Sequence, residues 1–281
     1  MEASNQTDSS ELMLNTALVR DILTRFIRDE TQSAGFRRGV VGLSGGVDSA
    51  VSATLAAEAL GRDNVTAVLM PHKQSHRSSL EDARKVVDFL RIQSEIVDIT
   101  GMTEAYCGKY GVEGRNRQGN VMARMRMVVL YDVSARENAL VIGTSNKSEI
   151  LTGYGTIFGD LASAINPLGD LYKSQVWQLA EALNLPPSIV HKKPSADLWE
   201  GQTDEADLGI SYRKLDSLLF RMVDERRTDD ELHGLGFEST IIKRIRTMIR
   251  KNQYKRRPPV IAKVSYRTVN VDFRYVRDWG T

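Results

Sequence analysis

The sequence predicts an α/β fold, in which helices cover both faces of a doubly wound, mostly parallel sheet. Short runs rich in β-branched residues alternate with longer segments of helical periodicity over the first half of the chain. Strands that alternate with helices of this size imply right-handed crossovers and a parallel sheet that is buried on both faces. After Tyr172 no further buried strand is evident, which predicts a helical C-terminal part packed against the sheet.

An amphipathic helix comes first, over residues 14–27, because apolar side chains recur there every four positions. We expect buried strands at residues 39–43, 65–70, 95–98 and 139–143. Helices are expected between them at residues 48–60, 78–90 and 120–138, and after them at residues 173–183, 211–225 and 238–251. These elements form one domain, residues 12–260, between a disordered N-terminal tail, residues 1–11, and a C-terminal extension, residues 261–281.

The composition is that of an ordinary globular protein, with 41% hydrophobic and 26% charged residues. The formal net charge of +2 gives no overall field that would attract nucleic acid or a membrane surface. No apolar stretch approaches the roughly 20 residues that a membrane-spanning helix needs. The polar N-terminus has no signal-peptide core, and the single cysteine, Cys107, allows no intrachain disulfide. We therefore expect a cytoplasmic protein.

The turn after the first strand carries the strongest functional signal. Two adjacent glycines permit the left-handed backbone of an anion-binding nest, and they let a phosphate approach the backbone N–H groups. The helix that follows directs about half a positive charge at the same point. Ligands of doubly wound sheets bind beyond the carboxyl ends of the strands. The residues expected to hold the phosphates of ATP are Gly42, Leu43, Ser44, Gly45, Gly46, Val47, Asp48 and Ser49.

This turn differs from the common phosphate-binding motifs. The chain has no G-x-x-x-x-G-K-[ST], and the glycine spacing does not fit the dinucleotide motif G-x-G-x-x-G. Asp48 and Ser49 follow the glycines in place of a lysine. A carboxylate beside bound phosphates repels them unless a cation lies between, so Asp48 predicts Mg²⁺. The alternative is a ligand-free Gly-Gly turn in which Asp48 caps the helix.

The segment 44–49 resembles the signature of the N-type ATP pyrophosphatases, and later motifs resemble the NAD synthetase family within that group. These motifs lie at residues 143–149, 153–154, 159–160, 167–173, 193–199, 201–205, 208–209 and 254–257. Their order and spacing extend the resemblance over roughly residues 12–260. The resemblance implies a Rossmann-like fold of the adenine nucleotide alpha-hydrolase type.

The resemblance implies an ATP-dependent ligase that converts deamido-NAD (nicotinic acid adenine dinucleotide) to NAD. In this family ATP adenylates the nicotinate carboxylate, pyrophosphate leaves, and ammonia then displaces AMP. The family is similar throughout in forming homodimers, with the dinucleotide near the subunit interface. Two alternatives stay open: another N-type ATP pyrophosphatase that acts on a different carboxylate or carbonyl substrate, and a regulatory domain that senses ATP without chemistry.

The resemblance also implies roles for single residues. The catalytic candidates are Asp48, Glu149 and Lys173, of which the two carboxylates would bind Mg²⁺ and the lysine would offset charge on the leaving pyrophosphate. Both carboxylates follow strand ends at one edge of the sheet, so they can converge on one metal site. Thr144 and Ser195 would join the ATP site. The candidates for deamido-NAD binding are Asn120, Arg124, Asp160, Tyr254 and Lys255.

Three positions bear on the dinucleotide contacts. Arg126 lies about 200° around the helix from Arg124, so the two arginines cannot both face one ligand. Tyr254 stands where many family members have a histidine, and Ile157 where some have a lysine. Neither side chain can supply the charge of the residue it replaces near neutral pH.

The remaining polar residues give weaker signals. Cys107 lies in an expected connecting segment without a nearby histidine, so no glutaminase nucleophile is evident and free ammonia is the expected nitrogen donor. The polar segment 198–208 lacks periodicity and is a candidate mobile lid. The histidines complete no zinc pattern and are expected to be structural; they are His72, His76, His191 and His233.

Overall fold

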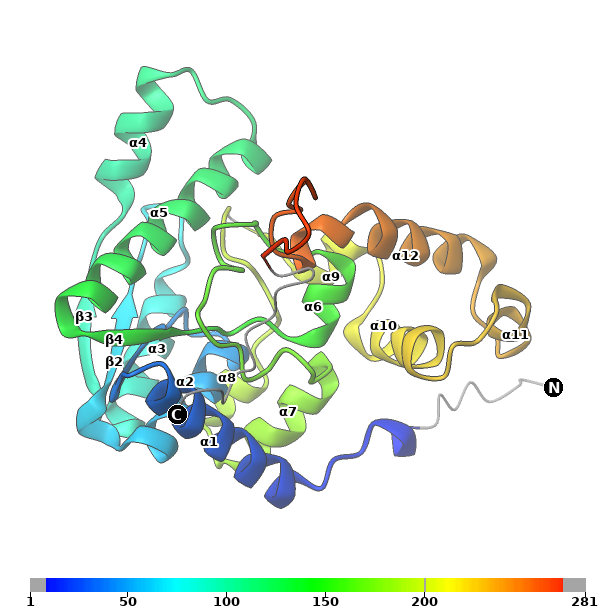
Figure 1. Ribbon diagram of the computed structural model, residues 1–281, viewed down its shortest axis with the longest axis horizontal. Coiled ribbons are helices and arrows are strands. Elements are labelled where there is room, and N and C mark those ends of the chain that lie inside the picture. Colours follow the sequence, from blue (N-terminus) through cyan, green and yellow to red (C-terminus); the bar gives the residue numbers. More distant parts are fainter. Residues whose placement is uncertain (1–8, 200, 270–281) are drawn as a thin grey trace.

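The computed structural model describes residues 9–199 and 201–269, and this part of the chain contains one four-stranded sheet (Figure 1). The strands are β1 Arg38–Gly42, β2 Val65–Leu69, β3 Gln93–Ile96 and β4 Ala139–Ile142. They pair in parallel in the order β3-β2-β1-β4. The chain thus runs outward from β1 to β3 and then crosses back to place β4 on the other side of β1. This topology confirms the predicted fold class.

The two faces of the sheet carry different helices because alternate strand residues point to opposite sides. Val41 and Ala67 belong to a core cluster with α1 Thr16–Ser33, α2 Val47–Leu60, α3 Arg77–Leu90, α7 Lys173–Ala182 and α8 Pro187–Val190. Their strand neighbours Val40 and Val68 belong to a second cluster, which is built mainly with α5 Arg115–Glu137. The helix α4 Thr100–Lys109 packs against α5.

The C-terminal helices lie together at one side of the molecule (Figure 1), and their buried side chains form a core of their own. They are α10 Tyr212–Leu219, the π-helix η3 Phe220–Asp224, α11 Asp229–Gly234 and α12 Ser239–Lys251. Their main contacts outside this group are with α7 and with α6 Lys147–Thr152, rather than with the sheet as expected. Trp177 on α7 packs against this core and the sheet core, and its ring meets Tyr212 edge-on at a centroid distance of 6.2 Å.

The sequence does not predict several short elements, because segments of three to six residues show no clear periodicity. They include α6, α8, α11 and α9 Asp204–Leu208, and the 3₁₀-helices are η1 Ser9–Leu12, η2 Arg62–Asn64 and η4 Gln253–Arg256. The expected helix at residues 211–225 changes to π geometry at Phe220. The segment expected to connect two elements around Cys107 is the helix α4, so that expectation was wrong.

The long helix α5 begins at Arg115, five residues before its expected start. Gly119 therefore lies inside the helix, although glycine normally weakens one. A Cβ there would approach Leu198 Cδ1 to 2.9 Å, so the glycine makes room for that side chain.

The ends of the chain are described in part. Residues 1–8 of the expected tail and residues 270–281 of the expected extension lie outside the described ranges. No helix within residues 9–199 and 201–269 is long and apolar enough to cross a membrane.

Candidate active site

The turn between β1 and α2 is closed by short polar contacts. Ser49 Oγ donates a hydrogen bond to Gly46 O at 3.0 Å and accepts one from Ser44 N at 3.2 Å. Gly45 has a φ of +78°, and a Cβ there would collide with the carbonyl oxygen of Ser79 on α3. Only glycine fits this position, where the loop backbone passes against a neighbouring helix.

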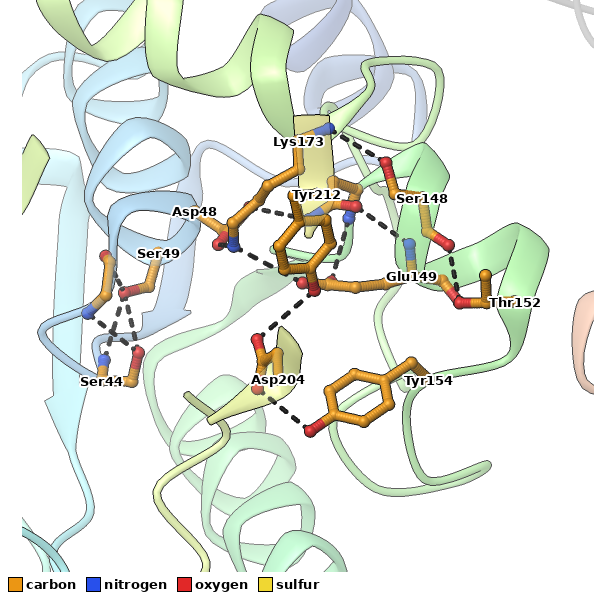
Figure 2. A network of polar contacts seen from close by, with 12 residues as sticks. Ser44, Asp48, Ser49, Ser148, Glu149, Thr152, Tyr154, Lys173, Asp204 and Tyr212 are labelled. Carbon is orange, nitrogen blue, oxygen red and sulfur yellow. Dashed lines mark hydrogen bonds and ion pairs between the residues drawn. The ribbon is translucent and has the colours of Figure 1, made fainter. Parts of the chain in front are cut away.

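Asp48 lies in the first turn of α2 but does not cap the helix, because the N-cap position is occupied by Gly46. Its two carboxylate oxygens instead accept hydrogen bonds from Lys173 Nζ and, at 2.9 Å, from Asn146 Nδ2 (Figure 2). The structure therefore contradicts the capping role that a ligand-free turn would give to Asp48. The carboxylate is directed across the sheet edge, toward α6 and α7.

Lys173 joins the two carboxylates that were expected to bind a metal. Its Nζ forms an ion pair with Asp48 and lies 3.7 Å from Glu149 Oε1. The lysine side chain is 3% exposed, and the side chains of Asp48 and Glu149 are 16% and 17% exposed. Asp48 follows β1 while the other two residues follow β4, so the fold brings the three catalytic candidates together at one edge of the sheet.

Local contacts place Glu149 at the start of α6. Asn146 Oδ1 accepts a hydrogen bond from Glu149 N at 3.0 Å, and Glu149 Oε2 accepts one from Asn146 N at 3.3 Å. This reciprocal pair is a capping box. Glu149 is thus a helix-start carboxylate and also a partner of Lys173, since its second oxygen remains available to the lysine.

The cluster contains more acidic than basic side chains. Burial and the neighbouring charge of Asp48 raise the pKa of Glu149 to about 8. Burial disfavours the charged form of Lys173, but the carboxylates of Asp48 and Glu149 outweigh it and raise the lysine pKa. The lysine therefore stays protonated. A divalent cation beside Glu149 would favour its ionised form in the same way.

A third carboxylate, Asp204, was not predicted to belong to the site. It begins α9 and is 4% exposed, and it accepts hydrogen bonds from Tyr154 Oη at 3.0 Å and Tyr212 Oη at 3.3 Å (Figure 2). Burial raises its pKa, which its interaction with Lys173 partly offsets. The only sequence signal was its place within the motif at residues 201–205.

A cavity of about 860 Å³ opens beside this cluster, at the carboxyl ends of β1, β2 and β4. Of the residues expected to bind ATP, those that line it are Gly42, Leu43, Ser44, Thr144 and Ser195. Of the deamido-NAD candidates, those that line it are Asn120, Asp160 and Lys255. The cavity wall does not include Glu149, Lys173, Arg124 or Tyr254.

The three dinucleotide candidates in the cavity wall also hold the segment 153–160. Asn120 Oδ1 accepts a hydrogen bond from Thr156 Oγ1, and Asp160 Oδ1 accepts one from Thr156 N, both at 2.7 Å. Lys255 Nζ donates to the carbonyl oxygens of Gly153 and Gly155, at 2.8 Å each. These side chains therefore shape one wall of the cavity through loop contacts.

The two arginines of α5 separate as the helix geometry predicts. Arg126 lines the cavity and donates a hydrogen bond to Met70 O at 3.1 Å, whereas Arg124 is exposed and donates to Ile157 O at 3.3 Å. Sequence reasoning chose Arg124 for the ligand and did not choose Arg126. Tyr254 is 60% exposed and lies outside the cavity wall.

His72 is a further cavity residue, expected to be structural. It is 6% exposed, and its Nδ1 accepts a hydrogen bond from Gln74 N at 3.2 Å. Its Nε2 has no hydrogen-bond partner among the residues that the structure describes. Within the same part of the chain, no three His, Cys, Asp or Glu side chains are grouped so that they could hold a metal ion by themselves.

Part of the expected lid is packed, while Gly201, Ala206 and Asp207 are exposed. Leu198 lies against Gly119, and Gln202 and Asp204 are 7% and 4% exposed. Glu200 lies outside the described ranges. Opening of this segment therefore stays a prediction.

A doubly wound parallel sheet with a glycine turn after its first strand and polar side chains at the carboxyl ends of its strands is typical of nucleotide-binding enzymes. The chain matches the family NAD synthase over residues 19–259. It is 54% identical over 272 residues to an NH3-dependent NAD(+) synthetase of Chlorobaculum parvum, an alignment that covers 97% of this chain and 98% of that protein. The chain belongs to the NAD synthase family.

Solved structures agree with this assignment. An NH3-dependent NAD synthetase from Campylobacter jejuni superposes with a TM-score of 0.77 at 35% identity, covering 89% of this chain and 100% of that one. An NMN synthetase from Francisella tularensis superposes with a TM-score of 0.80 at 31% identity, covering 89% of this chain and 99% of that one. The comparisons confirm the resemblance and favour a ligase of this family over other ATP pyrophosphatases and over an ATP sensor.

Proposed function

We propose that this chain catalyses the ATP-dependent amidation of deamido-NAD to NAD with ammonia. Deamido-NAD adenylate is the intermediate, and AMP and pyrophosphate are released. The observation that supports this most directly is the convergence of Asp48, Glu149 and Lys173 beside the phosphate loop, in a member of the NAD synthase family. Adenylation needs positive potential at that place and needs no side-chain nucleophile.

Repulsion between the nicotinate carboxylate and the α-phosphate is the main electrostatic obstacle to adenylation. The loop N–H groups and the α2 N-terminus stabilise phosphate charge, and Lys173 supplies a full positive charge next to them. Because its pKa is raised, the lysine keeps this charge throughout the neutral range. As pyrophosphate leaves, the same groups stabilise the negative charge that it carries away.

The carboxylates fit Mg²⁺, which prefers oxygen ligands and usually binds one or two carboxylates together with substrate phosphates. Asp48 and Glu149 would hold it, with phosphate oxygens and water completing the coordination. When bound, the ion would neutralise phosphate charge and polarise the α-phosphorus. The raised pKa of Glu149 supports this assignment, since a nearby cation relieves the repulsion between the two carboxylates.

The exposed side of α5 supports the proposed homodimer. Arg124, Val128 and Tyr131 are exposed at helical spacing on α5. Tyr106 is exposed on the adjacent α4, and Tyr110 is exposed directly after that helix. Large apolar side chains grouped in this way are typical of a protein interface. A dinucleotide bound near that interface would bring Arg124 into reach, although it lies outside the cavity wall of the single chain. Tyr254, which also lies outside the cavity wall, stays a candidate for deamido-NAD binding for the same reason.

Free ammonia is the proposed donor, as in the relatives named NH3-dependent synthetases. The half-buried Cys107 lies on α4 and not in the cavity wall, which supports the view that it has no catalytic role. The cytoplasm, where thiols stay reduced and ATP is available, is the proposed location.

A turnover assay with deamido-NAD, ATP, Mg²⁺ and ammonium tests the function. The expected products are NAD, AMP and pyrophosphate, and formation of ADP and phosphate would exclude adenylation. Glutamine in place of ammonium should give little NAD. Because one similar structure is described as an NMN synthetase, the deamido form of NMN is the competing substrate to assay. If kcat/KM is higher for the mononucleotide than for deamido-NAD, the mononucleotide is the substrate and the proposal is wrong on this point.

A further inference from the structure

A buried carboxylate outside the catalytic cluster links the helices that carry its members. Asp216, on α10, is 0% exposed. Its Oδ1 accepts a hydrogen bond from Ser148 Oγ at 2.6 Å, and its Oδ2 accepts one from Ser174 N at 2.7 Å. One of these donors belongs to the first turn of α6 and the other to the first turn of α7.

Each of these contacts is made next to a proposed catalytic residue. Ser148 directly precedes Glu149, and Ser174 directly follows Lys173. The hydroxyl of Ser148 also accepts a hydrogen bond from Lys173 N at 3.0 Å (Figure 2). Asp216 and Ser148 thus satisfy two backbone N–H groups of α7 and tie them to α6. These are donors that have no partner within the helix itself.

The chemistry of the contact favours an ionised Asp216. A carboxylate forms strong hydrogen bonds with backbone donors at a helix N-terminus, where the helix dipole is positive. Burial raises the Asp216 pKa to about 6, so the group is mainly ionised near pH 7.5. A buried charge is retained only where its hydrogen bonds compensate the loss of water. Here the compensating donors are the starts of two catalytic helices.

We propose that Asp216 is a positioning residue, which fixes the start of α6 against the start of α7 and thereby the distance between Glu149 and Lys173. The effect of Asp216 on catalysis rests on the proposed function, whereas its effect on the two helix starts does not. The C-terminal helices would thus act on the reaction through the position of α6 and α7. Its neighbour one turn earlier on α10, Tyr212, lies against the same lysine, with Nζ 5.2 Å from the ring centroid.

The test is Asp216→Asn in the full-length protein, which keeps the shape of the side chain but removes one acceptor. A displacement of about 1 Å in a catalytic group can lower the rate about a hundredfold. We expect kcat for NAD formation to fall about ten- to a hundredfold, while the KM values for ATP and deamido-NAD change much less. Unchanged kcat in a folded Asp216→Asn protein would overturn the proposal.

Ser148→Ala is the second variant, for the case that Asp216→Asn does not fold. It removes the bridge to α6 but leaves the bond from Ser174, so a smaller fall in kcat is expected. Ser148→Ala also removes the acceptor of Lys173 N, but both residues hold the same two helix starts, so the double variant should lose less kcat than the product of the two single effects. Multiplicative effects on kcat would show that the two residues act independently and would contradict the proposal.

Leu232→Ala is the matched control for lost stability. Leu232 is 0% exposed on α11 and belongs to the same C-terminal core, but it forms no part of α6 or α7. It should lower the Tm and leave kcat near the wild-type value at a temperature where the protein is folded. An equal loss of kcat in Leu232→Ala would mean that general loosening explains the result, and would overturn the positioning role.

Amide hydrogen exchange provides a readout that needs no turnover. In Asp216→Asn the N–H groups of Lys173 and Ser174 should exchange faster than in the wild type, while those of α2 do not change. If the wild-type protein formed no NAD, the proposed function would fail, and the exchange rates would still decide whether Asp216 holds the helix starts. Unchanged exchange at both amides would overturn the proposal.

Discussion

The two sides of the site are built in different ways. The phosphate loop is one continuous segment, and the hydrogen bonds within it join residues at most five positions apart, such as Ser44 and Ser49. The facing side takes Glu149, Lys173 and Asp204 from three separate helices. Their positions depend on contacts with the C-terminal helices. Substitutions in the phosphate loop should therefore affect only nearby residues. Substitutions in the helices on the facing side can lower the reaction rate even where they lie far from the catalytic residues.

The largest expected effect comes from the residue that joins the two sides. Asp48→Ala should lower kcat by at least a hundredfold, because a preorganised electrostatic contact contributes about 3 kcal/mol. The protein should stay folded, since Asp48 is not a helix cap. Steady-state NAD formation and circular dichroism measure the two properties. Asp63→Ala, at an exposed position after α2, is the control and should keep normal turnover. Near-normal activity of Asp48→Ala would refute the metal assignment.

Lys173→Met should separate stability from catalysis on the facing side. Removal of the buried cation leaves two carboxylates without their partner, which costs about 3–5 kcal/mol in comparable buried pairs. We expect a lower Tm and a fall in kcat of about a hundredfold. Mg²⁺ should restore more of the lost Tm in this variant than it adds to the wild type. Failure of Mg²⁺ to raise the Tm would argue against an ion between Asp48 and Glu149.

Substitutions of two neighbouring glycines test whether changes in the phosphate loop act locally. Gly45→Ala forces a Cβ against Ser79 O at a φ of +78°, whereas the nearest atom to a Cβ at Gly46 is Ser44 Oγ at 3.3 Å. We expect kcat/KM for ATP to fall about tenfold or more in Gly45→Ala, for strain of order 1–3 kcal/mol, and much less in Gly46→Ala. Calorimetric titration with ATP provides a second measurement. Equal effects would mean that the loop tolerates the strain by shifting.

The same contrast explains what the sequence could reveal. The phosphate loop and the strands β1, β2 and β4 depend on local patterns, so β-branched runs and paired glycines were enough to predict them. The strand β3 begins two residues before its expected start and is largely exposed, so the expectation of a buried strand was wrong there. Asp204 gave no such signal, because its place beside Lys173 follows from the packing of α9 and α10. Arg124 was chosen over Arg126 on the family resemblance, and helix geometry separates the two residues without showing which one lines the cavity. The short helices escaped for lack of periodicity.

The smallest expected effect concerns stability and pH. A carboxyl group with a raised pKa binds its proton more tightly in the folded than in the unfolded protein, so stability falls as pH rises between the two pKa values. For Glu149 the folded value is about 8 and the reference value is 4.5. In metal-free protein Glu149→Gln should therefore raise the Tm at pH 8 by a few degrees, and hardly at pH 5. Thermal melts at both pH values measure this.

The gain in Glu149→Gln should disappear when Mg²⁺ and ATP are added, because only the wild-type carboxylate can bind the ion. Catalytic activity should be lost at the same time. The direction of the change in Tm and of the change in activity matters more than their size. A side chain that lowers the stability of the metal-free protein but is required for turnover is needed for its charge. A lower Tm of metal-free Glu149→Gln at pH 8 would instead show that Glu149 is mainly an ion-pair partner of Lys173, held by the α6 capping box.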